Sequence, residues 1–137
     1  MYTYSTKTLI LDANFNVVAL TNPLGNSEVI SIKKIEISSA GTVQLCLYKT
    51  NRALEGVDMS GLIVSSDGIT PIGRVYAPQI TTGESVPIKH LISNMPTTLA
   101  DARDKITLEP GESLFINASR GDEHVDMVAT ILWSENG

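Results

Sequence analysis

The segment from Val125 to Trp133 constrains the fold most, because apolar side chains recur there at every second position over nine residues. A period of two is typical of a β-strand, whose successive side chains point to opposite faces of the sheet. The residues between them are also mostly apolar or β-branched, so we expect this strand to be central in its sheet or covered by another chain. The predicted core-facing residues are Val125, Met127, Ala129, Ile131 and Trp133.

The residues before this strand predict two further strands joined by a tight turn. Apolar residues alternate from Ile106 to Ser119 and are interrupted by Pro110 and Gly111. Proline presets φ at one turn position, and glycine allows a positive φ at the next. We therefore expect a strand, a turn and a strand.

The first fifty residues read as four strands. Strand-forming residues in 2–11 and 17–20 flank a polar turn, which predicts a first hairpin. Glu28 to Ser38 and Val43 to Tyr48 predict a second hairpin. The apolar phase changes across Lys33 and Lys34, which indicates a β-bulge.

The middle of the chain is less regular. Thr50 to Asp58 reads as a loop, and Pro87 places its strand at a sheet edge or a bulge because proline cannot donate to a ladder. Thr97 to Asp104 is the one stretch of helical composition, with Thr97 or Thr98 as its expected cap. The other expected strands are 59–64, 71–77 and 84–92.

These segments together predict the fold class. About eight strands at roughly 8 to 12 residue spacing are the pattern of an all-β sandwich. We expect one domain over residues 1–137, a jelly roll with one short helix at most.

Composition excludes several classes of function. A net charge of −5 with only ten Lys and Arg argues against a nucleic-acid groove. No apolar run approaches the ~18 residues that span a bilayer, and no signal segment is recognised, so we expect synthesis in a cytoplasm and no membrane partner. The single cysteine, Cys46, lies in an alternating run and is expected to be a small buried packing residue.

The sequence contains few residues that suit catalysis or metal binding. His90 and His124 are the two histidines, and they lie in different contexts. His124 and Asp126 share a strand face, but no third metal ligand accompanies them. We therefore expect no catalytic residue, no metal, no cofactor and no enzymatic activity.

A resemblance is carried by the C-terminal residues. The run from Thr107 to Leu114, followed by a last strand that closes on Leu132, Trp133, Ser134 and Glu135, resembles the end of small β-sandwich virion proteins of tailed bacteriophages. These are capsid cement or decoration proteins. The resemblance covers about a quarter of the chain. It implies a structural protein on the capsid surface of a virion, with the major capsid protein as its partner.

The charged fraction of 18% and the richness in Ser, Thr and Asn suit a surface that neighbours cover. We expect a homo-oligomer, with a trimer suggested by shell symmetry. The predicted partner-binding segment is 1–10, whose strand composition suits addition to a neighbouring sheet edge through Tyr2, Tyr4, Thr6 and Thr8.

Three alternatives stay open at this point. The first alternative for the N-terminal strand is a strand paired within its own sheet. The protein is alternatively a carbohydrate-binding or receptor-binding module of a phage tail or fibre. A small cupin-like enzyme is the third reading. Aromatic residues make up only 5% of the chain, which weakens the carbohydrate reading.

Overall fold

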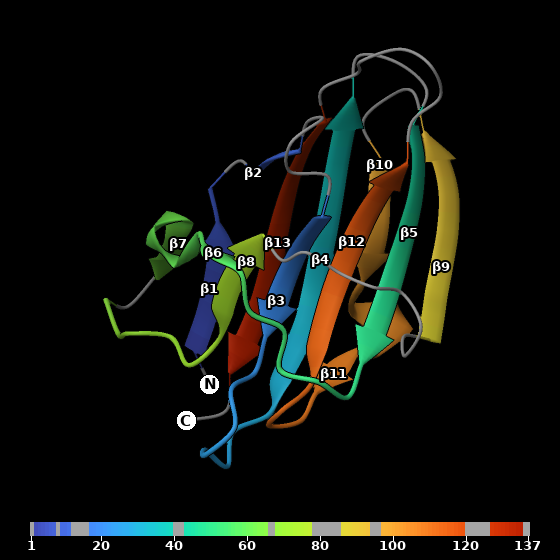
Figure 1. Cartoon of the computed structure of the whole chain (residues 1–137). Coiled ribbons are helices and arrows are strands. Elements are labelled where there is room, and N and C mark those ends of the chain that lie inside the picture. The colour runs from blue at the N-terminus through green and yellow to red at the C-terminus, as the bar shows by residue number, and fades with distance from the viewer. Residues whose placement is uncertain are drawn as a thin grey trace.

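A computed structural model of the chain shows two antiparallel β-sheets packed face to face (Figure 1). It describes residues 2–7, 9–11, 17–39, 43–65, 68–77, 86–93, 97–119 and 127–135. Sheet A has the order β10 (Thr97–Asp101), β4 (Ile30–Ser39), β13 (Met127–Glu135), β1 (Tyr2–Thr6) and β7 (Ile63–Ser65), with β11 (Thr107–Leu108) beside β4 and β2 (Leu9–Leu11) beside β13. Sheet B has the order β6 (Val57–Asp58), β8 (Arg74–Ala77), β3 (Val17–Thr21), β12 (Ser113–Ser119), β5 (Val43–Thr50) and β9 (Val86–Ser93).

Eight of these strands pair in a nested order. The outermost pair in the chain, β1 with β13, encloses β3 with β12, then β4 with β10, and finally β5 with β9. Contacts of β13 with β4 and of β12 with β5 join the pairs into two sheets. This nested pairing is that of a jelly roll, so the predicted all-β sandwich is confirmed.

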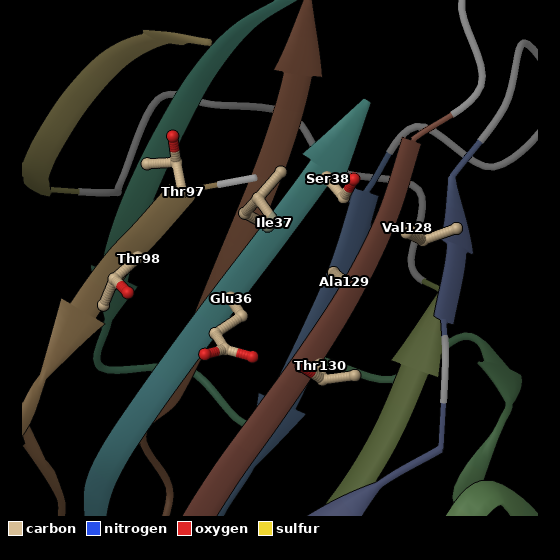
Figure 2. Close-up of a pocket in the computed structure, with 8 residues that line it drawn as sticks. All are labelled: Glu36, Ile37, Ser38, Thr97, Thr98, Val128, Ala129 and Thr130. Atoms are coloured by element: carbon tan, nitrogen blue, oxygen red, sulfur yellow. The ribbon is translucent and has the colours of Figure 1, made fainter. Parts of the chain in front are cut away.

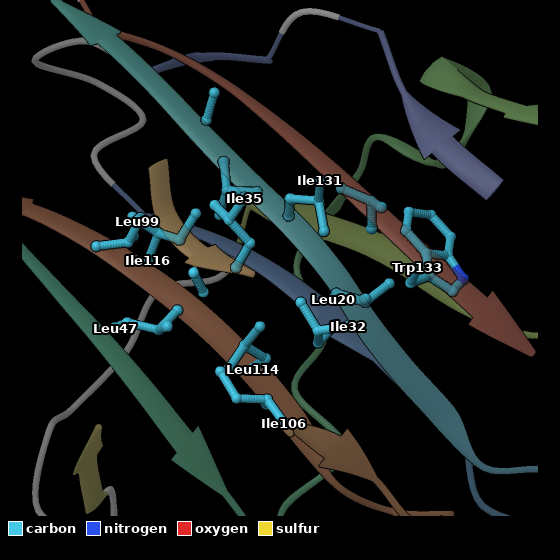
Figure 3. Close-up of a cluster of buried hydrophobic side chains, with 14 of the residues drawn as sticks. Leu20, Ile32, Ile35, Leu47, Leu99, Ile106, Leu114, Ile116, Ile131 and Trp133 are labelled. Carbon is cyan, nitrogen blue, oxygen red and sulfur yellow. The ribbon is translucent and has the colours of Figure 1, made fainter. Parts of the chain in front are cut away.

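The core lies between the two sheets and takes side chains from both. Figure 3 shows Ile35, Ile131 and Trp133 of sheet A facing Leu47 and Leu114 of sheet B. Trp133 is 0% exposed, and its ring centroid lies 5.9 Å from that of Tyr4. The prediction that Trp133 faces the core is confirmed, and β13 is central in its sheet as expected.

The phase change in β4 is a bulge. Leu132 of β13 lies opposite Lys34 while Trp133 lies opposite Ile32, so Lys33 is the extra residue. The bulge lets both Ile32 and Ile35 point into the core, where each is at most 2% exposed. Pro87 also lies where it was predicted, in the edge strand β9 beside a register shift.

Both predicted hairpins are wrong. The segments 2–11 and 17–20 lie in opposite sheets, and so do β4 and β5. A turn signal shows only that the chain reverses direction. It does not show whether the chain returns beside the previous strand or crosses to the facing sheet, as neighbouring strands do in a jelly roll.

The predicted helix at 97–104 is also wrong for most of its length. Thr97–Asp101 forms β10, and only Ala102–Asp104 forms a three-residue 3-10 turn, η3. Its cap is Asp101, which accepts a hydrogen bond from the Arg103 backbone N–H at 2.9 Å. A bulge at Leu99 buries both Leu99 and Ala100, so the strand lacks the alternation that would have revealed it. A second 3-10 turn, η1, spans Ser60–Leu62.

The predicted Pro110-Gly111 turn is present. The backbone N–H of Glu112 donates to the Glu109 carbonyl at 3.0 Å, and Gly111 has a φ of +89°. These are features of a type II turn. Because β11 pairs in sheet A and β12 in sheet B, the turn carries the chain across the end of the sandwich.

We expect Gly111→Ala to lower the free energy of unfolding by about 1 to 2 kcal/mol, because a side chain at positive φ is strained. The new Cβ also meets Leu24 Cδ2 at 2.7 Å. Urea unfolding measures the change. Gly61→Ala is the matched control, since no heavy atom lies within 4 Å of its added Cβ. Equal effects at the two positions would contradict the assignment of strain to Gly111.

Candidate functional site

The outer face of sheet A carries a shallow groove over β10, β4 and β13 (Figure 2). Its volume is about 340 Å³, and Glu36 lies in its middle between Thr98 and Thr130. A second hollow of about 180 Å³ shares Glu36 and Thr130 and extends to Ser5, Lys34 and Leu132. The two hollows form one surface, which we call the sheet A face.

Strand alternation places these side chains outside. Ile35 and Ile37 of β4 and Ile131 of β13 point into the core, so the residues between them point outward. The pairing registers set them in rows across the sheet. One row is Thr130, Glu36 and Thr98, and the next is Val64, Ser5, Leu132, Lys34 and Asp101.

The sheet A face is close to electrically neutral. Lys34 Nζ and Glu36 Oε1 lie 2.7 Å apart, with side chains 47% and 53% exposed, so the two charges offset each other. Most of the other outward side chains are hydroxyls, which both donate and accept hydrogen bonds. Val128 and Leu132 add half-buried apolar area. Such a mixed surface suits contact with a protein.

A second candidate surface lies on residues 51–77, a segment between β5 and β9 that is additional to the nested jelly-roll pairs. Its short strands extend both sheets on the same side: β7 pairs with β1 in sheet A, and β8 and β6 extend sheet B beyond β3. We call residues 51–77 the insertion. It shields the sheet edges that β1 and β3 would otherwise present.

Buried polar groups anchor the start of the insertion. Ser113 Oγ, on a side chain with no exposed area, accepts from the Leu54 backbone N–H at 2.9 Å and donates to the Arg52 carbonyl at 2.8 Å. Thr21 Oγ1 donates to the Leu54 carbonyl at 2.7 Å. The Leu54 side chain then packs on Phe115 in a second, smaller apolar cluster on the outer face of sheet B.

A buried carboxylate anchors the end of the insertion. Glu135 is 2% exposed. Its Oε1 accepts from the Ile72 N–H at 2.8 Å, and its Oε2 accepts from the Gly73 N–H at 2.8 Å and from Trp133 Nε1 at 3.0 Å. A Cβ on Gly73 would lie 3.2 Å from Oε2 and 3.1 Å from Ile30 Cδ1, so a larger residue there would require these side chains to shift by a few tenths of an ångström.

The anchored insertion exposes apolar side chains. Val57, Val64 and Ile69 are 57%, 45% and 41% exposed, and Leu24 is the one other large hydrophobic residue that the described part of the chain leaves exposed. We call these three residues the insertion patch. Nearby, hydrogen bonds from Ser60 and then Arg74 lower the pKa of Asp58, whose carboxylate lies 3.0 Å from the Arg74 guanidinium. The patch is thus apolar beside a neutralised ion pair.

The predicted partner-binding residues do not form an exposed edge. Tyr4 and Thr6 are 1% and 3% exposed and face the core. β1 pairs with β13 over Tyr2–Ser5 on one side and with β7 over Tyr4–Thr6 on the other. Tyr2 is half-buried and packs against the core. Thr8 lies outside the described residues. The alternative reading, a first strand paired within its own sheet, is confirmed.

Cys46 also differs from its prediction. It is half-buried on the outer face of sheet B, because its neighbours Leu45 and Leu47 take the core positions. Hydrogen bonding to Cys46 raises the pKa of Tyr48, and partial burial adds to the rise. The Tyr48 ring stacks on Phe115 with centroids 4.9 Å apart.

The histidines add little to the described site. The backbone of His90 in β9 lies opposite Cys46, while His124 and Asp126 lie outside the described residues. Within those residues, no three His, Cys, Asp or Glu side chains gather as metal ligands. No helix in the same part of the chain is long and apolar enough to cross a membrane.

No protein-family model, curated protein or solved structure matches this chain. The sheet A face and the insertion patch are therefore the features that bear on function.

The insertion patch was missed in the sequence because single apolar residues in a loop carry no period. The outward position of Lys34 and Glu36 was available once the bulge at Lys33 was placed, since both residues alternate with core isoleucines.

Proposed function

We propose that this protein is a non-enzymatic virion component of the capsid cement or decoration type. The observation that carries the proposal is the insertion patch, in which Val57, Val64 and Ile69 are exposed on a segment held by buried hydrogen bonds. Three large apolar side chains left exposed on one anchored segment favour a protein-binding role for that segment. The resemblance of the C-terminal segment to phage decoration proteins supplies the partner, the major capsid protein.

The geometry suits a structural role on a shell. The insertion lies outside the nested strands, so its exposed side chains are able to vary without disturbing the jelly-roll pairs, while Val75 of β8 belongs to the core. Its anchors, Ser113 and Glu135, belong to β12 and β13 of the jelly roll. A force on the patch therefore reaches both sheets through these two anchors. A cement protein strengthens a shell when it bridges the shell subunits through such a rigid connection.

A carbohydrate-binding module is less well supported. Sugar-binding sites present flat aromatic rings, but Trp133 and Phe115 are 0% exposed and Tyr4 is 1% exposed. Tyr48 is engaged in stacking on Phe115. Trp133 and Tyr4 belong to the core, and Phe115 and Tyr48 pack together in the smaller cluster of sheet B.

The test is occupancy on purified phage particles that contain the protein, measured by electron cryomicroscopy and quantitative mass spectrometry. The double variant Val57→Asp with Ile69→Asp should reduce occupancy by at least about tenfold, because it places charge in an apolar contact. Both side chains are exposed, so the variant should fold with unchanged thermal stability.

Ala102→Asp is the matched control, because Ala102 is exposed on η3, which follows the edge strand β10 at the opposite end of sheet A from β7. It should leave occupancy unchanged. Wild-type occupancy of the double variant, or purified particles that lack the protein altogether, would overturn the proposal.

A further inference from the structure

We propose that the sheet A face binds a second copy of this chain around a two-fold axis that crosses β4 between Lys34 and Glu36. Val57 and Ile69 of the insertion patch lie outside this surface, whereas Val64 ends one of its rows beside Ser5. The association does not depend on a capsid role.

Lys34 and Glu36 make the sheet A face self-complementary in charge. They are outward neighbours on β4, of opposite sign, and about half exposed. A two-fold axis in the plane of the contact reverses the direction of β4 in the second copy. Lys34 of one copy then faces Glu36 of the other, and Glu36 faces Lys34, so both charges gain a second counter-charge.

The same axis produces a favourable contact on the neighbouring strand. Leu132 lies opposite Lys34, and Thr130 lies opposite Glu36. The axis therefore crosses β13 at Ile131 and brings Leu132 of each copy over Thr130 of the other. The leucine side chain and the threonine methyl group are buried together, while the threonine hydroxyl stays at the margin.

The remaining side chains fit a second copy better than a partner of one charge sign. A basic or an acidic partner would repel either Lys34 or Glu36, whereas a second copy matches both. Hydroxyls such as those of Ser38 and Thr98 both donate and accept hydrogen bonds, so a hydroxyl of one copy is able to bond to a hydroxyl of the other. Face-to-face packing of two sheets is also a common arrangement of β-structure.

The experiment measures oligomeric state by sedimentation of the full chain. We expect the wild type to be a dimer. Lys34→Glu alone places four acidic groups at the contact, and Glu36→Lys alone places four basic groups there. Each single variant should associate about 100-fold or more weakly, because like charges meet across the interface.

Mixing the two single variants distinguishes this interface from a loss of the Lys34–Glu36 pair within one chain. An equimolar mixture should form a heterodimer, because the acidic face of the Lys34→Glu variant then meets the basic face of the Glu36→Lys variant. The control reverses two exposed charges elsewhere, Lys105→Glu with Glu109→Lys, and should leave the dimer unchanged. Circular dichroism confirms that each variant is folded.

Three results would overturn the inference. The first is a wild-type monomer at the highest soluble concentration. The second is a dimer or trimer that either single variant leaves intact. The third is a pair of monomeric single variants that stay monomeric when mixed.

Discussion

Replacing Trp133 with alanine should lower the free energy of unfolding by about 3 to 5 kcal/mol, because the change removes a large buried ring and leaves a cavity. The ring has no exposed area and lies between the two sheets beside Tyr4. Its Nε1 also donates to Glu135 at 3.0 Å, and this bond is lost with the ring. Urea or guanidinium unfolding followed by circular dichroism measures the change.

Trp133→Phe separates the two contributions. Phenylalanine keeps much of the apolar volume but has no N–H to donate, so its cost should be smaller than that of alanine. A Trp133→Ala variant of wild-type stability that fails to bind a sugar or receptor would instead favour a binding-module role for the ring.

The sequence predicted the strands of this fold better than their partners. The alternation up to Trp133, the phase change at Lys33 and the Pro110-Gly111 turn each depend on residues close together in the chain. Burial imposes these patterns directly, because a strand with one face on a core must alternate. The bulge and the turn were correct, and so was the alternation at Ala129, Ile131 and Trp133. Val125 and the side chain of Met127 lie outside the described part of the chain.

Pairing depends on residues far apart in the chain, and there the sequence was misleading. The Glu28–Ser38 and Val43–Tyr48 segments read as one hairpin, yet β4 pairs with β10 and β13 while β5 pairs with β9 and β12. The composition of Thr97–Asp104 favours helix, but burial of Leu99 and Ala100 determines that its first five residues form a strand. Tertiary contacts outweighed local preference in both cases.

The candidate surfaces were predictable only in part. The apolar outward residues of the last strand predicted that another chain could cover one sheet face. The sheet A face is the corresponding surface, and its contact with another chain is a proposal. The expected free edge at Tyr4 and Thr6 is not exposed, because β7 of the insertion pairs with it. Nothing in the residues 63–65 indicates that they pair with β1, fifty-seven or more positions earlier, rather than with a nearer strand.

Glu135 shows most clearly that contacts between residues far apart in the chain determine whether a side chain is buried. Glu135 carries a charge, yet it is 2% exposed and accepts three hydrogen bonds. Two of the donors are backbone groups of the insertion. The carboxylate therefore ties β13 to the segment that leads into β8.

We expect Glu135→Ala to lower the free energy of unfolding by about 2 to 4 kcal/mol, because it leaves two buried N–H groups and one partly buried N–H group without their acceptor. Glu135→Gln should cost less, since one oxygen still accepts. Its amide NH2 group must nevertheless face at least one of the N–H donors, because both carboxylate oxygens are occupied as acceptors. Chemical unfolding gives the two free energies, and amide hydrogen exchange at Ile72 and Gly73 locates the effect. Faster exchange at these two amides is expected in both variants. Unchanged exchange together with unchanged stability in Glu135→Ala would show that the insertion is held without this carboxylate.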